Sequence, residues 1–146
     1  MIDCPFCSID DERQRILEER QYVYIIPSNP RLVPHHLLVI PKRHIERPSE
    51  LEPEERRELF DTVIEFQEKI IALQWAPGCD VRQNCRPFLP QNNIKIDHAH
   101  WHLLPRWPED DLYLRTQIFE RDVFTKLSPT EMRQEMEILQ SILRAP

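Results

Sequence analysis

Glycine is nearly missing from this sequence. The chain of 146 residues contains one glycine, Gly78, beside fourteen prolines. Rossmann fingerprints and P-loops need several glycines so that backbone amides can approach a phosphate, and neither motif can be written here. The classes of nucleotide enzyme that depend on a glycine-rich phosphate loop are therefore excluded.

Long apolar runs and an excess of positive charge are missing as well. The apolar runs are short, as in residues 37–40, and none approaches the ~18 uninterrupted apolar residues of a membrane span. The N-terminus begins Met1, Ile2, Asp3 instead of with a basic and then apolar signal, which predicts a cytoplasmic protein without a membrane partner. Lysine plus arginine is 19 against 25 acids, and this net charge of −6 argues against nucleic acid as a partner.

The residues that are present predict one globular domain over residues 1–146. Hydrophobic residues make up 40% and charged residues 30% of the chain, and the length leaves no room for a second catalytic domain. Prolines divide the part before residue 50 into short extended pieces, because proline fixes its own φ and moves the preceding residue out of the helical region. Strands are expected at 22–26 and 36–40.

Helical patterns follow in the middle and at the end of the chain. Apolar residues recur at helical spacing behind Pro53, which predicts a helix from residue 54 to about residue 77. Ser128, Pro129 and Glu131 match the N-cap, first-turn proline and capping-box acid of a second helix. Further extended segments are expected at 80–84, 93–106 and 116–123. This order predicts an α+β fold, an antiparallel sheet of about five strands with one long central helix and a C-terminal helix.

Three histidines alternate with apolar residues at His98, His100 and His102. Side chains alternate between the faces of a strand, so one face carries three imidazoles and the other is apolar. Aligned imidazoles can ligate a metal, or one can attack an electrophile while its neighbours donate protons. Residues 82–106 carry four cations and one acid, a sum of +3 that favours a phosphate electrophile over a merely solvated basic edge.

The N-terminal cysteines are spaced as a CxxC motif, Cys4 and Cys7, which zinc sites and redox motifs share. A closed structural zinc site takes about four ligands, so two further sulfur or nitrogen donors are required. The alternative is a pair of exposed reduced thiols. Cys79 and Cys85 are expected to be packing residues.

The run His-Ala-His-Trp-His-Leu-Leu from His98, with Pro-Arg after it, resembles the signature of the histidine-triad (HIT) family of nucleotide hydrolases and transferases. Residues 34–44, Pro-His-His-Leu-Leu-Val-Ile-Pro-Lys-Arg-His, are similar to that family's upstream motif. The resemblance extends from Cys4 to about Trp107 and implies a HIT-like fold.

The resemblance also implies a two-step covalent mechanism. The central histidine, His100, would attack the α-phosphorus of a nucleotide, and water or a second acceptor would then release the nucleoside monophosphate. His102 would hydrogen-bond the phosphate or the leaving group, and His36 would lie at the same pocket. Asn84 takes the place of the family's phosphate-binding asparagine, with Asn92 and Asn93 as weaker candidates.

Two positions depart from the family pattern. The loop at 86–97 has no glycine, and Lys95 stands where a serine or threonine is usual. Ser28 stands where an acid or amide contacts the ribose. The expected nucleotide contacts are thus Ser28, His36, Asn84 and Lys95. The substrate stays open among phosphoramidates, dinucleoside polyphosphates and adenylylated molecules of a purine nucleotide.

The resemblance further implies a zinc ion held by Cys4, Cys7, His44 and His98, and a homodimer in which two sheets join edge to edge. Two other functions remain open from the residues. One is a nucleotide-binding module without catalysis, which the glycine-free loop and Ser28 favour. The other is a catalytic metal site formed by the triad itself.

Overall fold

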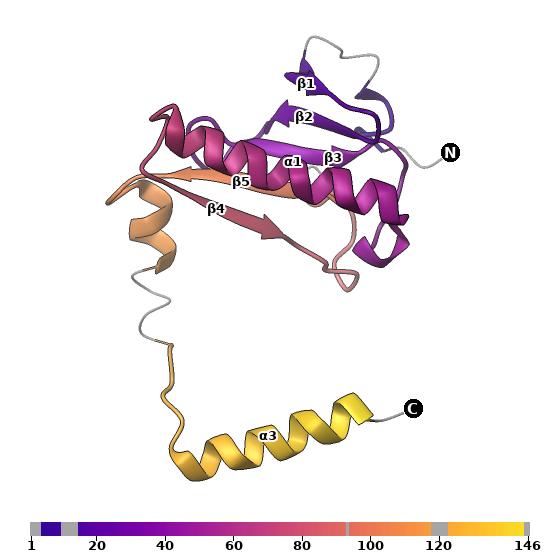
Figure 1. Ribbon diagram of the computed structural model, residues 1–146. Coiled ribbons are helices and arrows are strands. Elements are labelled where there is room, and N and C mark those ends of the chain that lie inside the picture. The colour runs from indigo at the N-terminus through magenta and orange to yellow at the C-terminus, as the bar shows by residue number, and fades with distance from the viewer. Residues whose placement is uncertain (1–3, 10–14, 93, 118–122, 145–146) are drawn as a thin grey trace. The chain divides into compact units, whose positions relative to one another are not determined.

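The computed structural model describes residues 4–9, 15–92, 94–117 and 123–144. These residues fall into two units, one up to Tyr113 and one from Leu114, and each is described by itself. The first unit contains a five-stranded antiparallel sheet with a long helix against it (Figure 1). The second contains the C-terminal helix. The predicted α+β class is therefore confirmed, while the single domain boundary at 1–146 stays a prediction.

The sheet places the strand that contains His102 between two other strands. Its strands are β1 (Glu18–Glu19), β2 (Val23–Pro27), β3 (Leu37–Pro41), β4 (Gly78–Gln83) and β5 (Trp101–Arg106), in the order β1-β2-β3-β5-β4. Every neighbouring pair is antiparallel. In this register His102 of β5 lies opposite Leu38 of β3 on one side and opposite Arg82 of β4 on the other. Segments far apart in the chain thus meet at His102.

Helix α1 (Pro53–Ala72) covers one face of the sheet (Figure 1). Pro53 suits the first turn, and the Glu55 carboxylate accepts the backbone N–H of Glu52 at 2.9 Å, as in a capping box. The buried apolar stripe of α1 consists of Leu59, Val63, Phe66 and Ile70. It packs on the strand residues that point the same way, Leu37, Val39, Trp101 and Leu103.

The opposite face of the sheet carries His102 and adjoins His36, whereas His98 and His100 precede β5 and lie outside the sheet. Alternation along β3 turns Leu38 and Ile40 away from α1 into a second apolar cluster with Tyr24 and Ile26. His36 precedes β3 by one residue and shares this face, as does His102, which lies opposite Leu38. We call this side of the sheet the histidine face.

Several predicted boundaries were wrong. Helix α1 ends at Ala72 rather than near residue 77, and the chain turns away through Gln74, whose φ is 58°. Strand β5 begins at Trp101 rather than at 93, a residue that lies outside the described ones. The expected extended segment at 116–123 begins instead inside a π-helical turn, Tyr113–Gln117, and 118–122 lie outside the described residues. The short β1 was not predicted, because two residues carry no periodicity.

Helix α3 (Pro129–Arg144) has the predicted cap. The backbone N–H of Ser128 donates to Glu131 Oε2 at 2.8 Å, and that of Glu131 donates to Ser128 Oγ at 3.3 Å. All residues of α3 are exposed within the described chain. Among the described residues, no helix combines the length and the apolar character needed to cross a bilayer.

Candidate functional site

The hydrogen bonds of His100 determine which of its ring nitrogens is free. His100 Nδ1 lies 2.7 Å from the carbonyl oxygen of His98. A carbonyl oxygen accepts hydrogen bonds and cannot donate, so Nδ1 must carry the proton of the neutral ring. The lone pair is then on Nε2. The family resemblance implies that His100 is a nucleophile, and Nε2 is the ring nitrogen left free for that role.

His36 and His102 form a directed chain of hydrogen bonds. The backbone N–H of Leu32 donates to His36 Nδ1 at 3.2 Å, which places the ring proton of His36 on Nε2. His36 Nε2 then donates to His102 Nδ1 at 3.0 Å. His102 in turn carries its proton on Nε2. The rings of His100 and His102 have centroids 4.8 Å apart, so the ring that offers a lone pair and the ring that offers an N–H are neighbours.

Burial keeps these imidazoles neutral. Removal from water lowers the pKa of His100, and it lowers the pKa of His36 to about 4 with help from the charges of His100 and Arg82. Burial, followed by His100, His36 and Arg82, lowers the pKa of His102 to about 3. At neutral pH the three rings are therefore uncharged, and the tautomers assigned above persist.

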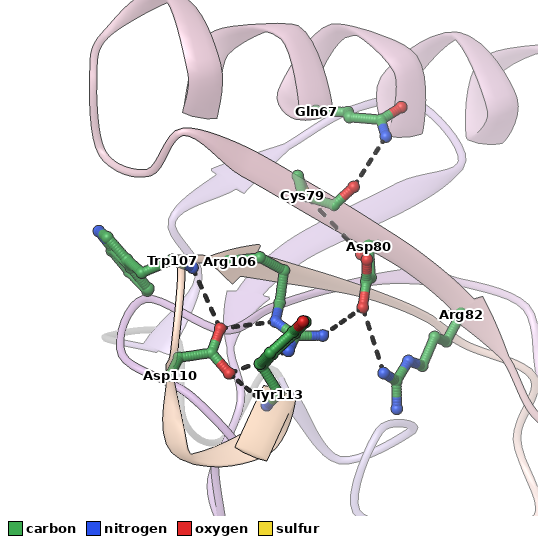
Figure 2. Close-up of polar contacts among 8 residues, drawn as sticks. All are labelled: Gln67, Cys79, Asp80, Arg82, Arg106, Trp107, Asp110 and Tyr113. Atoms are coloured by element: carbon green, nitrogen blue, oxygen red, sulfur yellow. Dashed lines mark hydrogen bonds and ion pairs between the residues drawn. The ribbon is translucent and has the colours of Figure 1, made fainter. Parts of the chain in front are cut away.

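A network of alternating charges adjoins the histidine face at β4 (Figure 2). Asp80 Oδ2 accepts from Arg106 Nη1 at 2.5 Å and from Arg82 Nη2 at 3.2 Å. Arg106 also forms a bidentate pair with Asp110, at 2.7 and 2.9 Å. Figure 2 shows Gln67 of α1 on one side of β4 and both arginines on the other. The network therefore fixes Asp80 on the histidine face, and Asp80 holds Arg82.

Asp110 anchors this network at the end of β5. Its carboxylate also accepts the backbone N–H groups of Trp107 at 3.1 Å and Tyr113 at 2.6 Å. The hydrogen bonds from Arg106, together with these backbone donors, lower the pKa of Asp110 to about 2. The carboxylate is therefore charged at neutral and mildly acidic pH, where Arg106 keeps its partner.

The predicted metal ligands come together in space. One ligand atom from each of Cys4, Cys7, His44 and His98 lies within 4.8 Å of all the others. Cys4 Sγ is 3.4 Å and Cys7 Sγ 3.7 Å from His98 Nδ1, and Cys7 Sγ is 3.2 Å from His44 Nδ1. This geometry makes the four residues a candidate metal site that joins the N-terminus, the segment after β3 and the start of the triad.

The remaining contacts of the cluster fit a metal rather than a set of hydrogen bonds. His98 Nε2 donates to the carbonyl oxygen of Pro41 at 2.9 Å, so His98 Nδ1 presents a lone pair to the sulfurs. Burial and the adjacent Cys4 raise the pKa of Cys7 to about 11, since two thiolates repel one another without a cation between them. His44 Nε2 is buried and has no hydrogen-bond partner among the described residues, so the polar contact of this ring is the one inside the cluster.

The other expected site residues are less closely gathered. Asn84 and Lys95 line one pocket beside His98, together with Arg47 and Arg86. The Lys95 ammonium forms an ion pair with Asp97. Ser28 is not part of that pocket lining, and its hydroxyl donates to the carbonyl oxygen of Pro30 at 2.8 Å.

The two remaining cysteines have different surroundings. Cys79 packs against the core beneath α1, as expected. Cys85 is exposed, so the prediction that it packs was wrong. It follows the last residue of β4 by two positions, where the chain has left the sheet.

Sequence reasoning did not place four contributors to the site. Phe6, inside the CxxC motif, lies edge-on to His98 and His100 with ring centroids 5.7 and 5.2 Å away. The backbone amide of Leu32 left no signal in the sequence. Asp80 left a signal, because it alternates with Cys79 and Val81 on β4, and Arg82 was counted in the positive charge of residues 82–106 but not placed beside His102.

Solved structures of known proteins share this fold. A protein from Streptococcus mutans is 25% identical, with 99% of this chain and 87% of that chain covered and a TM-score of 0.72. A HIT family protein from Bacillus anthracis is 26% identical, with coverages of 97% and 93% and a TM-score of 0.70. A HIT family hydrolase from Clostridium thermocellum is 24% identical over 75% of this chain and 96% of that one, with a TM-score of 0.57.

Two further comparisons concern the sequence. The comparison with curated proteins returned no match. The model of the HIT domain matches residues 10–109, more than half of the chain, and this range includes His36, Asn84 and the whole triad. With the five-stranded sheet, the histidine face and the structural relatives, this match shows that the chain belongs to the HIT domain family.

Proposed function

We propose that this protein is a nucleotide hydrolase or nucleotidyl transferase that acts on the α-phosphate of a purine nucleotide conjugate. One observation carries the proposal: the bond from His100 Nδ1 to the carbonyl oxygen of His98 leaves His100 Nε2 with its lone pair, beside the N–H of His102. A nucleophile and an adjacent hydrogen-bond donor are what phosphoryl attack requires. The similar HIT family hydrolase from Clostridium thermocellum supports the same kind of activity.

The proposed reaction has two steps. In the first, His100 Nε2 forms a bond to the α-phosphorus, and the bond from phosphorus to the leaving group breaks with its electron pair on the leaving group. In the second, water or another acceptor attacks the same phosphorus, loses a proton to solvent and returns the electron pair to Nε2. His102 Nε2–H donates a hydrogen bond to a phosphate or leaving-group oxygen in both steps. Ser28, His36, Asn84 and Lys95 complete the proposed nucleotide site.

A nucleotide-binding module without turnover is the second candidate. The glycine-free loop at 86–97 and the short Ser28, which depart from the family pattern, favour it, and the ion pair with Asp97 leaves Lys95 less charge to stabilise a reacting phosphoryl group. A catalytic metal held by the triad itself finds no support in the geometry. His98 faces the cysteines, and His102 Nδ1 is occupied by His36.

We propose zinc for the cluster of Cys4, Cys7, His44 and His98. Tetrahedral coordination, with Zn–S near 2.3 Å and Zn–N near 2.0–2.1 Å, separates sulfur and nitrogen ligands by about 3.6 Å. The three sulfur–nitrogen distances run from 3.2 to 3.7 Å. When bound, zinc would supply a rigid, redox-inert link between these residues.

The covalent intermediate gives the decisive experiment. The native chain and the variant His100→Ala are mixed briefly with adenosine phosphoramidate and quenched with alkaline denaturant, in which a phosphorus–imidazole bond survives, and their masses are measured by intact-protein mass spectrometry. We expect an adenylyl adduct on the native chain and on the control His35→Ala, whose ring packs near Trp75 and Trp107 and not against the triad. His100→Ala is expected to show no adduct and to lose at least about 1000-fold in turnover.

Two results would contradict this proposal. Turnover that survives in His100→Ala would exclude His100 as the nucleophile. Calorimetric binding of adenosine monophosphate, without turnover or a burst in rapid-quench kinetics, would instead favour the binding module.

A further inference from the structure

Arg82 is a cation on the histidine face that the proposed reaction has not used. It lies directly opposite His102 in the antiparallel pairing of β4 and β5. Directly opposite residues point to the same face, with Cβ atoms about 4.5–5.5 Å apart. The charge of Arg82 also contributes to the lowered pKa values of His36 and His102, as its place beside them on this face implies.

The Arg82 guanidinium is held and still has donors to offer. Asp80 Oδ2 accepts from Arg82 Nη2 at 3.2 Å, and Asp80 is itself fixed by Arg106 (Figure 2). Arg106 is in turn clamped by Asp110. A guanidinium has five N–H donors, and the bond to Asp80 uses one of them. The side chain of Arg82 is 36% exposed, so the remaining donors are accessible beside His102.

The hydrogen-bond chain limits what His102 can give to a leaving group. His102 is neutral and carries a single proton, on Nε2. To give that proton away and stay neutral, it would have to take the proton of His36 Nε2. His36 Nδ1 is bonded to the amide of Leu32, which is no proton source, so His36 would be left as an imidazolate. His102 can therefore hydrogen-bond a departing oxygen but has no spare proton for it.

A leaving group that departs as an anion needs no proton, but it needs positive charge nearby. A phosphate or polyphosphate oxygen meets this condition, and Arg82 is placed to bind it bidentately. An amine leaving group differs on both counts. It must gain a proton to depart, and it has no negative charge for a guanidinium to bind.

We propose that Arg82, positioned by Asp80, is a specificity-determining residue that selects substrates whose leaving group carries phosphate, such as dinucleoside polyphosphates, over phosphoramidates. This inference rests on the proposed covalent function of His100. In the selected reaction the bond from the α-phosphorus to its bridging oxygen breaks, and the electron pair stays on that oxygen. The released nucleotide departs as an anion that accepts hydrogen bonds from Arg82 and His102.

The test compares two substrates in the same variants. The ratio of kcat/KM for diadenosine triphosphate to kcat/KM for adenosine phosphoramidate is measured in the native chain, Arg82→Gln, Arg82→Lys and the control Arg57→Gln on α1. Arg82→Gln is expected to lower kcat/KM for diadenosine triphosphate by roughly 10–100-fold, the range for a charge-assisted hydrogen bond. For the phosphoramidate we expect a change of less than about 3-fold.

The remaining variants separate charge from fold. Arg82→Lys keeps the charge without the bidentate fork and is expected to recover part of the ratio. Arg57→Gln is expected to leave both values unchanged. If Arg82→Gln does not fold, the ratio of the two kcat/KM values can still be compared between the native chain and Arg82→Lys. The dependence of that ratio on salt concentration is measured in the same two proteins.

Three outcomes would overturn the inference while leaving the proposed function intact. The first is that Arg82→Gln lowers kcat/KM equally for both substrates, and the second is that it lowers kcat/KM for neither. The third is that the native chain has a higher kcat/KM for the phosphoramidate than for diadenosine triphosphate. A native chain that turns over neither substrate and forms no adduct at His100 would instead refute the proposed function itself.

Discussion

At the scale of the residue, the role of each histidine depends on what its second nitrogen contacts. A carbonyl oxygen holds His100 in one tautomer, and a backbone amide begins the chain that holds His36 and His102 in the other. The triad pattern was sufficient to predict His100 as the nucleophile. It could not predict the tautomers, because the amide of Leu32 lies 70 positions before His102 in the sequence.

The tautomers can be observed directly by nitrogen NMR. In protein labelled with 15N-histidine, long-range correlation spectra at pH 7 are expected to show His36 and His102 protonated at Nε2 and His100 at Nδ1. Because burial lowers the pKa values of His36 to about 4 and His102 to about 3, their spectra should not change between pH 7.5 and 5.5. A free imidazole, with a pKa near 6.5, titrates within that window.

These lowered pKa values also have a consequence for stability. Above pH 6.5 both the folded and the unfolded chain hold neutral imidazoles, so these residues add no pH dependence. Below it the unfolded chain binds protons that the folded chain refuses, and stability falls until the pH reaches about 4 for His36 and about 3 for His102. If the NMR spectra showed either His36 or His102 titrating near pH 6.5, the assigned chain of hydrogen bonds between them would be wrong.

At the scale of the element, the sequence predicted those helices and strands that contain their own boundary residues and hydrophobic period. Strand β3, helix α1 and helix α3 were found because each has a proline or a cap and a clear hydrophobic period. The start of β5 was not predicted, because a strand begins where a partner strand pairs with it. The pairing of β3 with β5 involves only Leu37 to Val39 of β3, and the sequence of β5 does not contain that information. The charged network of Asp80, Arg82 and Arg106 depends on register between strands, which no single segment contains.

The N-terminal segment depends on the cluster at the start of the triad. The proposed zinc joins Cys4 and Cys7 to His44 and His98, and Phe6 between the cysteines packs edge-on against His100. Removal of the metal would thus disturb both stability and the nucleophile. When such a link is a disulfide, its loss lowers the free energy of unfolding by about 2–5 kcal/mol. For a protein of this size, each loss of about 1 kcal/mol lowers Tm by roughly 2–4 °C.

The expected result is about one zinc per chain by metal analysis of protein purified without chelator. Cys4→Ser is expected to lose the metal, lower Tm by about 5–15 °C and reduce adduct formation at His100. Cys85→Ser, which removes an exposed thiol, serves as the control and should keep both metal and Tm. Absence of zinc from the native protein, or its retention in Cys4→Ser, would contradict the assignment.

At the scale of the whole molecule, the sheet ends in an open edge at β4. The order β1-β2-β3-β5-β4 leaves one side of β4 without a strand partner in the described part of the chain. Val81 on this strand is 38% exposed, and Phe60 on the neighbouring helix α1 is 43% exposed. Open edges invite pairing with another chain. We therefore propose that β4 pairs with its copy in a homodimer, as the family resemblance implies.

Light scattering after size exclusion tests the dimer. The native chain is expected to elute with twice the monomer mass. Val81→Glu is expected to give a monomer, because it places like charges opposite each other across a symmetric edge. Leu17→Glu, at the opposite edge of the sheet, is the matched control and should stay dimeric. A monomeric native chain, or a dimer in Val81→Glu, would contradict pairing through β4.

The distance in sequence between the cluster's ligands has a consequence for synthesis. Cys4 leaves the ribosome 94 residues before His98. At about 5–20 residues per second, the intervening chain takes about 5–20 s to make. During that interval the nascent chain is an open dithiol that oxidants and competing metals can reach, and the edge-on contact between Phe6 and His100 does not yet exist. Translation speed therefore sets how long the CxxC segment is vulnerable, and the contact of Phe6 with His100 can form only after residue 100 has been made.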